Sequence, residues 1–278
     1  MQTLKIFTCL FLFTMPALLY GQWGGYTSVS ESIKASNGVI TKMSVEWQDG
    51  QRQVRVKSRG KITINLEEND LESISPNGWF VLEARTRQHF RRITIESNTR
   101  GNLSYHYATE ATSTGWGTKQ QAFFSRVFQE VIRETGILSR ARADLIYSKE
   151  GEEGILREMK SIKRERSRRF YCERLLDLED LKPATLLAIA KESTKFKADA
   201  NIKIIVSRLI DVNQTSTLCQ LAMLDAISSI NDEVTRANVL SDFSMIRRDN
   251  IAIKEAFDRI AYSIHSPVER TRVLSARK

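Results

Sequence analysis

The sequence is poor in the residues that usually carry metal binding, redox chemistry or catalysis. Its 278 residues include only three cysteines, three histidines and four prolines. There is no CxxC pair and no cysteine–histidine spacing of the kind that holds zinc, and His89, His106 and His265 are scattered along the chain. These absences argue against a zinc domain, a thioredoxin-like motif and a histidine metal centre. We therefore expect no metal and no cofactor.

The familiar catalytic signatures are missing as well. The sequence has no HExxH, GxSxG, Walker loop, GxGxxG or EF-hand loop. Glu67, Glu68, Asp70 and Glu72 form an acidic cluster that could offer paired carboxylates, but it lacks the regular offsets and the turn glycine of a calcium loop. We interpret the cluster as a solvated strand end and predict no catalytic residues, while an enzyme with an unfamiliar site stays open as an alternative.

The first 21 residues have the order of a cleavable signal peptide. Lys5 supplies a positive charge, residues 6–20 form a 15-residue apolar run without charge, and Gly21 is a small residue at its end. This run is short for a bilayer-spanning helix, which needs about 20 residues. Leu19 stands where a small residue is usual, so an uncleaved anchor is the alternative. We predict export to the periplasm or beyond the cell, with no transmembrane segment after removal of the signal.

Loss of the signal segment leaves two cysteines, Cys172 and Cys219, each within a helical apolar pattern. One disulfide between them would be compatible with export. Unpaired cysteine also packs as a small hydrophobic residue. We expect buried free thiols and leave the disulfide open.

Residues 22–117 read as an antiparallel β domain. Apolar and polar residues alternate between residues 39 and 107, for example at Met43, Val45 and Trp47. Turn signals fall at residues 48–51, 58–60, 76–78 and 100–102. Short strands joined by short loops imply antiparallel pairing, in which one face is packed and the other is wet.

Residues 118–278 read as a stack of helical hairpins. A phenylalanine-rich helix is expected over residues 120–135, with Gly136 as its stop, and it is our candidate to cover the sheet. Residues 229–240 and 263–274 match at six positions with an offset of 34, and weaker copies begin near Ser161 and Thr194. Further helices are expected at 183–193, 217–228 and 251–262. Two helices per repeat of this length are typical of an α-solenoid, and an irregular bundle is the alternative. The predicted fold class is α+β.

Charge and aromatic residues suggest where a partner could bind. The net charge is +9, and the helical half carries 29 basic against 23 acidic residues. Seven basic residues lie between positions 157 and 169, which suits an anionic surface but is also typical of a charged outer helix. Trp79 and Phe80 are adjacent, so they face opposite sides of a strand. The candidate binding residues are Trp79, Phe80, Arg164, Arg166, Arg168 and Arg169.

Several segments resemble uncharacterised bacterial exported proteins and similar segments found behind the membrane domain of antibiotic-sensing metallopeptidases. The resemblance covers most of residues 60–278, and its most specific piece is the sequence Ile-Ser-Pro-Asn-Gly at 74–78. The other matching segments are residues 60–64, 70–73, 91–96, 101–103, 131–136, 140–142 and 155–162. The resemblance implies a sensory or binding role in the envelope, and it brings no active site, because the metallopeptidase HExxH is absent.

Taken together, the sequence predicts an exported, non-catalytic binding protein that offers a helical-repeat surface to a protein or peptide partner in the bacterial envelope. The alternatives are an exported hydrolase with an unrecognised site and a basic protein held at an anionic envelope surface. The signal segment argues against a nucleic-acid partner in the cytoplasm.

Overall fold

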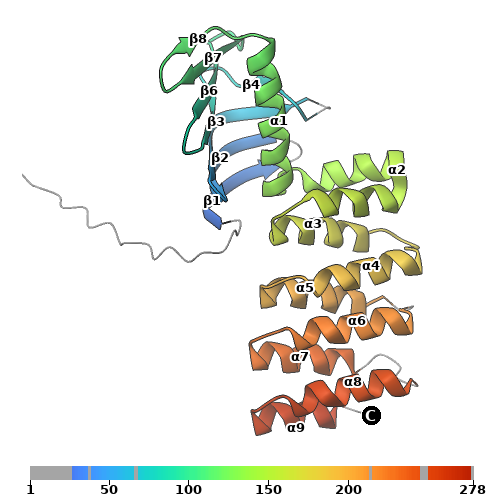
Figure 1. Cartoon of the computed structure of the whole chain (residues 1–278). Helices are drawn as coiled ribbons and strands as arrows, with labels where there is room; N and C mark the ends of the chain where they lie inside the picture. Colours follow the sequence, from blue (N-terminus) through green and yellow to red (C-terminus); the bar gives the residue numbers. More distant parts are fainter. Residues whose placement is uncertain (1–26, 37–38, 66–67, 213–214, 245–249, 277–278) are drawn as a thin grey trace, which may run out of the picture.

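The computed structural model describes residues 27–36, 39–65, 68–212, 215–244 and 250–276. The predicted signal peptide, residues 1–21, lies outside the described residues. Within them an antiparallel sheet of eight strands precedes nine helices, which confirms the α+β fold class. Figure 1 shows the sheet at one end of a long stack of helices. None of the described helices combines the length and the apolar character that crossing a bilayer requires.

The sheet follows the chain closely, because most neighbours are joined by tight turns. Its order is β1-β2-β3-β5-β6-β7-β8, with β4 beside the end of β3. The inward positions of β2, Met43, Val45 and Trp47, are almost fully buried, as the alternation predicts. The strands are β1 (Thr27–Ser36), β2 (Val39–Asp49), β3 (Arg52–Ile64), β4 (Leu71–Ile74), β5 (Trp79–Arg85), β6 (Phe90–Ser97), β7 (Leu103–Thr109) and β8 (Ser113–Thr114).

The turn predicted at residues 58–60 is wrong, because β3 runs through it. Gly60 has a φ of 102°, and a Cβ there would lie 2.7 Å from Ser75 Oγ and 3.1 Å from Gly78 Cα. The glycine therefore allows a close backbone approach inside a strand rather than a reversal. At this point β3 exchanges its partner β5 for the short strand β4.

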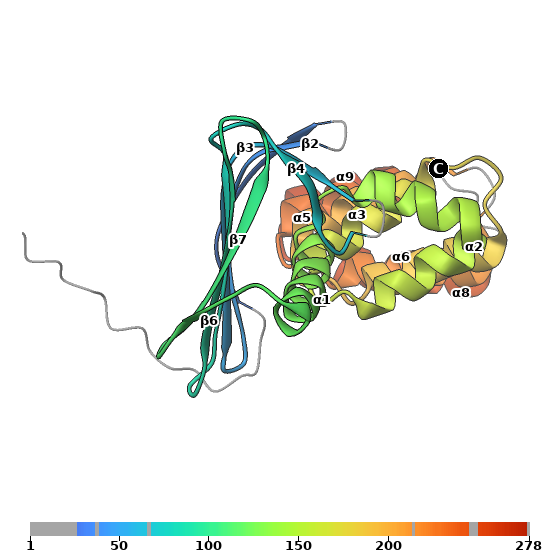
Figure 2. The same ribbon diagram turned by 90° about the horizontal axis from the view of Figure 1, so that it is seen from above.

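Helix α1 (Thr118–Thr135) covers one face of the sheet, as expected for the phenylalanine-rich segment (Figure 2). Phe80 on β5 packs edge-to-face against Phe124 and Phe128, with ring centroids 6.0 and 5.5 Å apart. The helix ends at Gly136, which has a left-handed φ of 66°. Because α1 shares the core of the sheet, the boundary between the two packed cores follows α1 rather than preceding it at residue 118.

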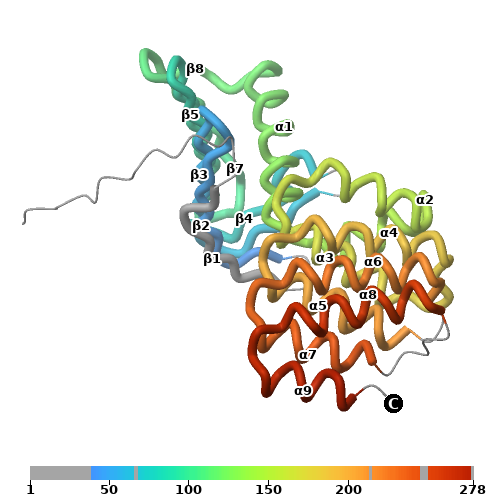
Figure 3. Tube along the Cα trace, turned by 60° about the horizontal axis from the view of Figure 1, so that its bottom comes forward, coloured from blue at the N-terminus to red at the C-terminus, as the bar shows by residue number. Residues whose placement is uncertain are grey.

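The remaining helices form two layers of a regular stack (Figure 3). Helices α3, α5, α7 and α9 form one layer, and α2, α4, α6 and α8 form the other. Each layer buries aliphatic side chains against the other in one continuous core. The bounds are α2 (Ser139–Ser161), α3 (Glu165–Leu176), α4 (Pro183–Ser193), α5 (Asp199–Ile210), α6 (Thr217–Ser228), α7 (Glu233–Phe243), α8 (Ile251–Tyr262) and α9 (Pro267–Ser275). The predicted ends of α4, α6 and α8 are confirmed.

Consecutive repeats are joined by a recurring hydrogen-bonded contact, which we call a rung. In each rung one carboxylate accepts hydrogen bonds from two successive backbone N–H groups of the turn that leads into a later helix. The first helical residue of α5, Asp199, accepts from Asn231 N at 3.1 Å and Asp232 N at 2.8 Å. Glu165 does the same for residues 197 and 198, and Glu233 for residues 265 and 266. Each rung satisfies N–H groups at a helix start that have no partner within their own helix.

The turns bound by the rungs show that the repeat is 34 residues long. Each turn begins with a buried apolar residue, and Ile162, Phe196, Ile230 and Ile264 follow one another at intervals of 34. The copy predicted to begin near Thr194 therefore begins one residue later. In the last repeat the acidic position holds Pro267.

The sheet domain supplies the first rung. Glu134, near the end of α1, accepts from Lys163 N at 3.0 Å and Arg164 N at 2.9 Å. Ser167 Oγ donates to the backbone oxygen of the same glutamate at 2.6 Å. Helix α1 thus takes the place of a preceding repeat, and the sheet is attached to the stack by the same device that joins the repeats.

Removal of a rung is expected to loosen the stack. Glu165→Ala deprives three donors of their acceptor, namely Lys197 N, Ala198 N and Asn201 Nδ2. We expect a loss of about 1–2 kcal/mol in the free energy of unfolding, measured by urea denaturation. The control is Glu255→Ala, which removes an exposed glutamate of α8. Equal effects of the two substitutions would contradict the role of the rung.

The last rung predicts an acid-sensitive contribution. The backbone N–H of His265, followed by its side chain and the N–H of Ser266, lowers the pKa of Glu233 to about 2 from the usual 4.5. Because the folded pKa is the lower one, this stabilisation is complete above about pH 5 and is lost as the pH falls toward 2. The Tm difference between wild type and Glu233→Gln should therefore narrow over this range. A difference that stays constant from pH 5 to 2 would refute the assignment.

Candidate functional site

The described residues hold few groups suited to catalysis. No set of three or more potential metal ligands comes together among them, and His89, His106 and His265 remain exposed and separate. Cys172 and Cys219 are buried free thiols. Burial raises the pKa of Cys172 and raises that of Cys219 to about 11. Both thiols therefore stay protonated near neutral pH, which is unlike a reactive cysteine.

The acidic cluster between β3 and β4 is divided among structural contacts. Glu67 lies outside the described residues. Glu68 forms an ion pair with Arg142 of α2, and Asp70 accepts from Gln121 Nε2 of α1 at 2.9 Å, while Glu72 is exposed. The loop therefore serves to dock the sheet domain on α1 and α2.

The predicted basic segment 157–169 is not one helix. It breaks at residues 162–164, between α2 and α3, and its arginines make different contacts. Arg164 uses its backbone N–H in the first rung. Arg168 donates to Lys163 O at 2.7 Å and pairs with Glu192 at 2.7 Å. A structural role accounts for the side chain of Arg168.

Two further arginines of this segment hold an aromatic ring. The guanidinium carbons of Arg166 and Arg169 lie 5.5 and 4.8 Å from the ring centroid of Phe170. That ring packs against Gly136, where a Cβ would approach it to 2.7 Å. Arg166 and Arg169 thus contact a different partner from Arg168.

The structure separates the two adjacent aromatics of β5. Phe80 is 1% exposed in the core beneath α1, so it is not available as a surface binding residue. Trp79 is half-buried and lines a hollow on the opposite face. Of this pair, only Trp79 remains a candidate.

The face of the sheet turned away from α1, which we call the outer sheet face, carries rows of polar side chains. One row crosses four strands as Glu46, Arg55, Glu83 and Arg92. Arg55 lies 2.9 Å from Glu46 and 3.5 Å from Glu83, and Arg92 lies 3.7 Å from Glu83. The hydrogen bond from Arg55 lowers the pKa of Glu46. No described helix or strand covers this face (Figure 2).

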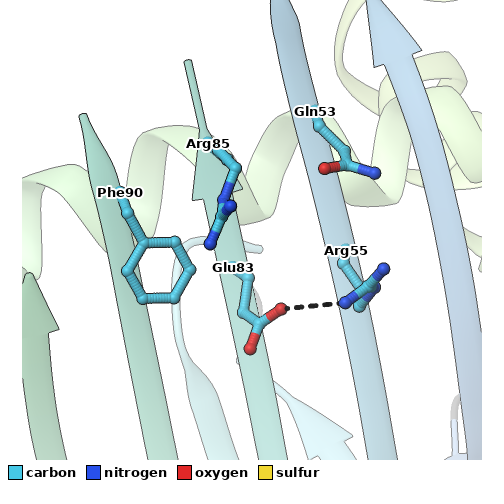
Figure 4. A pocket seen from close by; sticks show the side chains of 5 residues that line it. All are labelled: Gln53, Arg55, Glu83, Arg85 and Phe90. Atoms are coloured by element: carbon cyan, nitrogen blue, oxygen red, sulfur yellow. Dashed lines mark ion pairs between the residues drawn. The ribbon is translucent and has the colours of Figure 1, made fainter. Parts of the chain in front are cut away.

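Two neighbouring hollows lie on the outer sheet face. One of about 270 Å³ is lined by Arg55, Lys57, Trp79, Val81, Glu83 and Arg92. The other, of about 180 Å³, is lined by Gln53, Arg55, Glu83, Arg85 and Phe90 (Figure 4). They share the Arg55–Glu83 pair and together form one shallow, polar surface.

A larger hollow of about 560 Å³ lies on the helical stack, and we call it the α6–α8 groove. Buried Leu224, Ala256 and Ile260 provide apolar surface at its floor. Exposed Asp225 and Arg259 stand among its polar lining. Leu221, Ser228 and Ser263 complete it. Sequence reasoning missed this groove, because it arises from residues of two different repeats.

Comparison of the chain with protein-family models, curated proteins and solved structures found no match. The resemblance to exported envelope proteins therefore stays a prediction.

The structural interpretation of Arg168 can be tested directly. Arg168→Ala removes its bonds to the α2–α3 turn and leaves Glu192, whose side chain is 13% exposed, without this partner. We expect a loss of about 1–3 kcal/mol in unfolding free energy. Arg140→Ala, at an exposed position of α2, should stay within about 0.5 kcal/mol of wild type. A neutral effect at both positions would return Arg168 to the binding candidates.

Proposed function

We propose that the protein is an exported, non-catalytic binding protein of the bacterial envelope that presents its helical stack to a protein or peptide partner. The observation that carries this proposal is the α6–α8 groove, with an apolar floor between polar groups. The signal-like N-terminal sequence supports the envelope location.

The groove has the chemistry of a peptide site. Its volume of about 560 Å³ lies within the range of about 300–1,000 Å³ usual for ligand pockets. An apolar side chain of a partner can rest on Leu224 and Ile260, while Asp225 and Arg259 offer an acceptor and a donor beside it. Apolar anchoring flanked by polar contacts is the pattern by which helical grooves bind peptide segments.

The rungs hold the groove in shape before a partner arrives. Ser228 directly precedes the turn bound by Asp199, and Ser263 begins the turn bound by Glu233. The C-terminal ends of α6 and α8 are therefore fixed relative to α5 and α7. A preformed site avoids part of the ordering cost of association.

Photo-crosslinking from within the groove tests the proposal. A photoreactive residue at Leu221 of the full chain, produced in a bacterial host with its N-terminal segment, should crosslink one dominant envelope protein. The control is the same residue at Leu187, which is also half-buried and occupies the same position one repeat earlier. The crosslinked protein, once purified, should bind Leu221→Glu at least about tenfold more weakly than wild type, a difference of about 1.4 kcal/mol.

The proposal fails if Leu221→Glu and Leu187→Glu bind the purified partner with equal affinity. Equal crosslinking from both positions would also contradict the groove as the site. If neither position crosslinks and the intact protein turns over a substrate, the hydrolase alternative takes its place.

A further inference from the structure

The outer sheet face carries more cationic than anionic side chains, although exposed Glu96 of β6 lies opposite Trp79. Within its central row the carboxylates are recessed, with side-chain exposures of 18% for Glu46 and 21% for Glu83. Arg55 and Arg92 are 42% and 48% exposed. A ligand approaching the row therefore meets guanidinium groups first, and the acids orient them from below.

Next to this row stands an aromatic ring with further basic neighbours. Trp79 lies opposite Arg59 of β3, and Lys57 lies opposite Val81 one position along the same face. Lys57 and Arg59 are exposed and have no acidic partner within 4.0 Å among the described residues. An indole beside cations offers an apolar surface and charged donors together.

The backbone hydrogen-bonding groups of β5, at the centre of this face, are already paired within the sheet. Strand β5 is paired on one side with β3 and on the other with β6, so its N–H and C=O groups are engaged in the sheet. A bound peptide would need acceptors for its own amide N–H groups, yet Glu46 and Glu83 are already paired with arginines, and the further carboxylate beside Trp79 is the single Glu96. The face thus offers a ligand more hydrogen-bond donors than acceptors. This favours an anionic ligand that has no amide backbone.

The dimensions favour a long ligand. The two hollows, of about 270 and 180 Å³, are each smaller than the pockets of about 300–1,000 Å³ that enclose small molecules. They follow one another along β5 from Trp79 to Arg85, a span of roughly 20 Å at about 3.3 Å per residue. A chain that places successive units in shallow subsites matches this length.

We propose that the outer sheet face is a second binding surface, which takes an acidic polysaccharide. A sugar ring would stack its C–H face on Trp79. Carboxylates of the polysaccharide would accept from the surrounding basic side chains, which are Arg55, Lys57, Arg59 and Arg92. The proposal is independent of the α6–α8 groove, since the two surfaces share no residue.

Binding of polygalacturonate to the full chain tests the proposal by calorimetry. Lys57→Glu/Arg59→Glu should weaken binding at least about tenfold, and Trp79→Ala should weaken it at high salt as well as low salt, because stacking is not screened as charge contacts are. The first control is Lys203→Glu/Lys254→Glu, which changes the net charge equally at exposed positions of α5 and α8. The second is Tyr262→Ala, which removes another exposed aromatic. Both controls should bind within about threefold of wild type.

Matched ligands decide what is recognised. Methyl-esterified polygalacturonate keeps the sugar rings without the charge and should bind at least about tenfold more weakly. Poly-glutamate that binds as tightly as polygalacturonate would show a response to charge alone and would overturn the proposal. Preferential binding to phosphatidylglycerol vesicles would replace the polysaccharide by a membrane. A loss of affinity in Lys203→Glu/Lys254→Glu as large as that in Lys57→Glu/Arg59→Glu would also refute a localised site. Circular dichroism spectra that the substitutions leave unchanged would exclude unfolding as the cause of weaker binding.

Discussion

The structure depends on one recurring interaction, a carboxylate that binds two successive backbone N–H groups of a turn in the next repeat. Helix starts leave such groups without intrahelical partners, and apolar packing alone cannot satisfy them. In the stack the acceptor comes from Glu165, Asp199 or Glu233, each the first residue of its own helix. A carboxylate at this position also lies at the positive end of the helix dipole. One side chain therefore stabilises its own helix and fixes the start of the next helix in its layer.

The same interaction explains how two different architectures form one molecule. Glu134 of α1 binds the first turn of the stack, and ion pairs of Arg142 and Lys163 add contacts to the loops of the sheet. Burial raises the pKa of Glu134, although the two N–H groups act against this shift. Burying this acid is costly, and its bonds offset the cost only when the sheet domain and the stack are docked. The orientation of the outer sheet face thus follows from a contact in the stack.

Sequence patterns predicted what depends on local periodicity. The alternation in β2, the helix from 251 to 262 and the glycine stop at 136 each report burial or backbone conformation within a few residues, and all three are present. The rungs were missed, because glutamate and aspartate interchange at the acidic position and their partners lie more than 30 residues away. The segment 157–169 shows the same limit. Its charge was visible, but the contact of Glu134 with the turn at 162–164 joins residues about 30 positions apart, which no local pattern reveals.

Packing of the hydrophobic core decides which faces of the molecule stay open to a partner. The inner face of the sheet is largely occupied by α1, beside which a hollow of about 380 Å³ remains. No described helix or strand covers the outer face, and there the backbone is paired within the sheet. Recognition must then use side chains alone, which suits charge and stacking. On the stack, by contrast, neighbouring helices of one layer leave a groove with apolar groups at its floor. The two proposed surfaces therefore differ in chemistry, because one is made of side chains above a paired sheet and the other of apolar groups between helices of one layer.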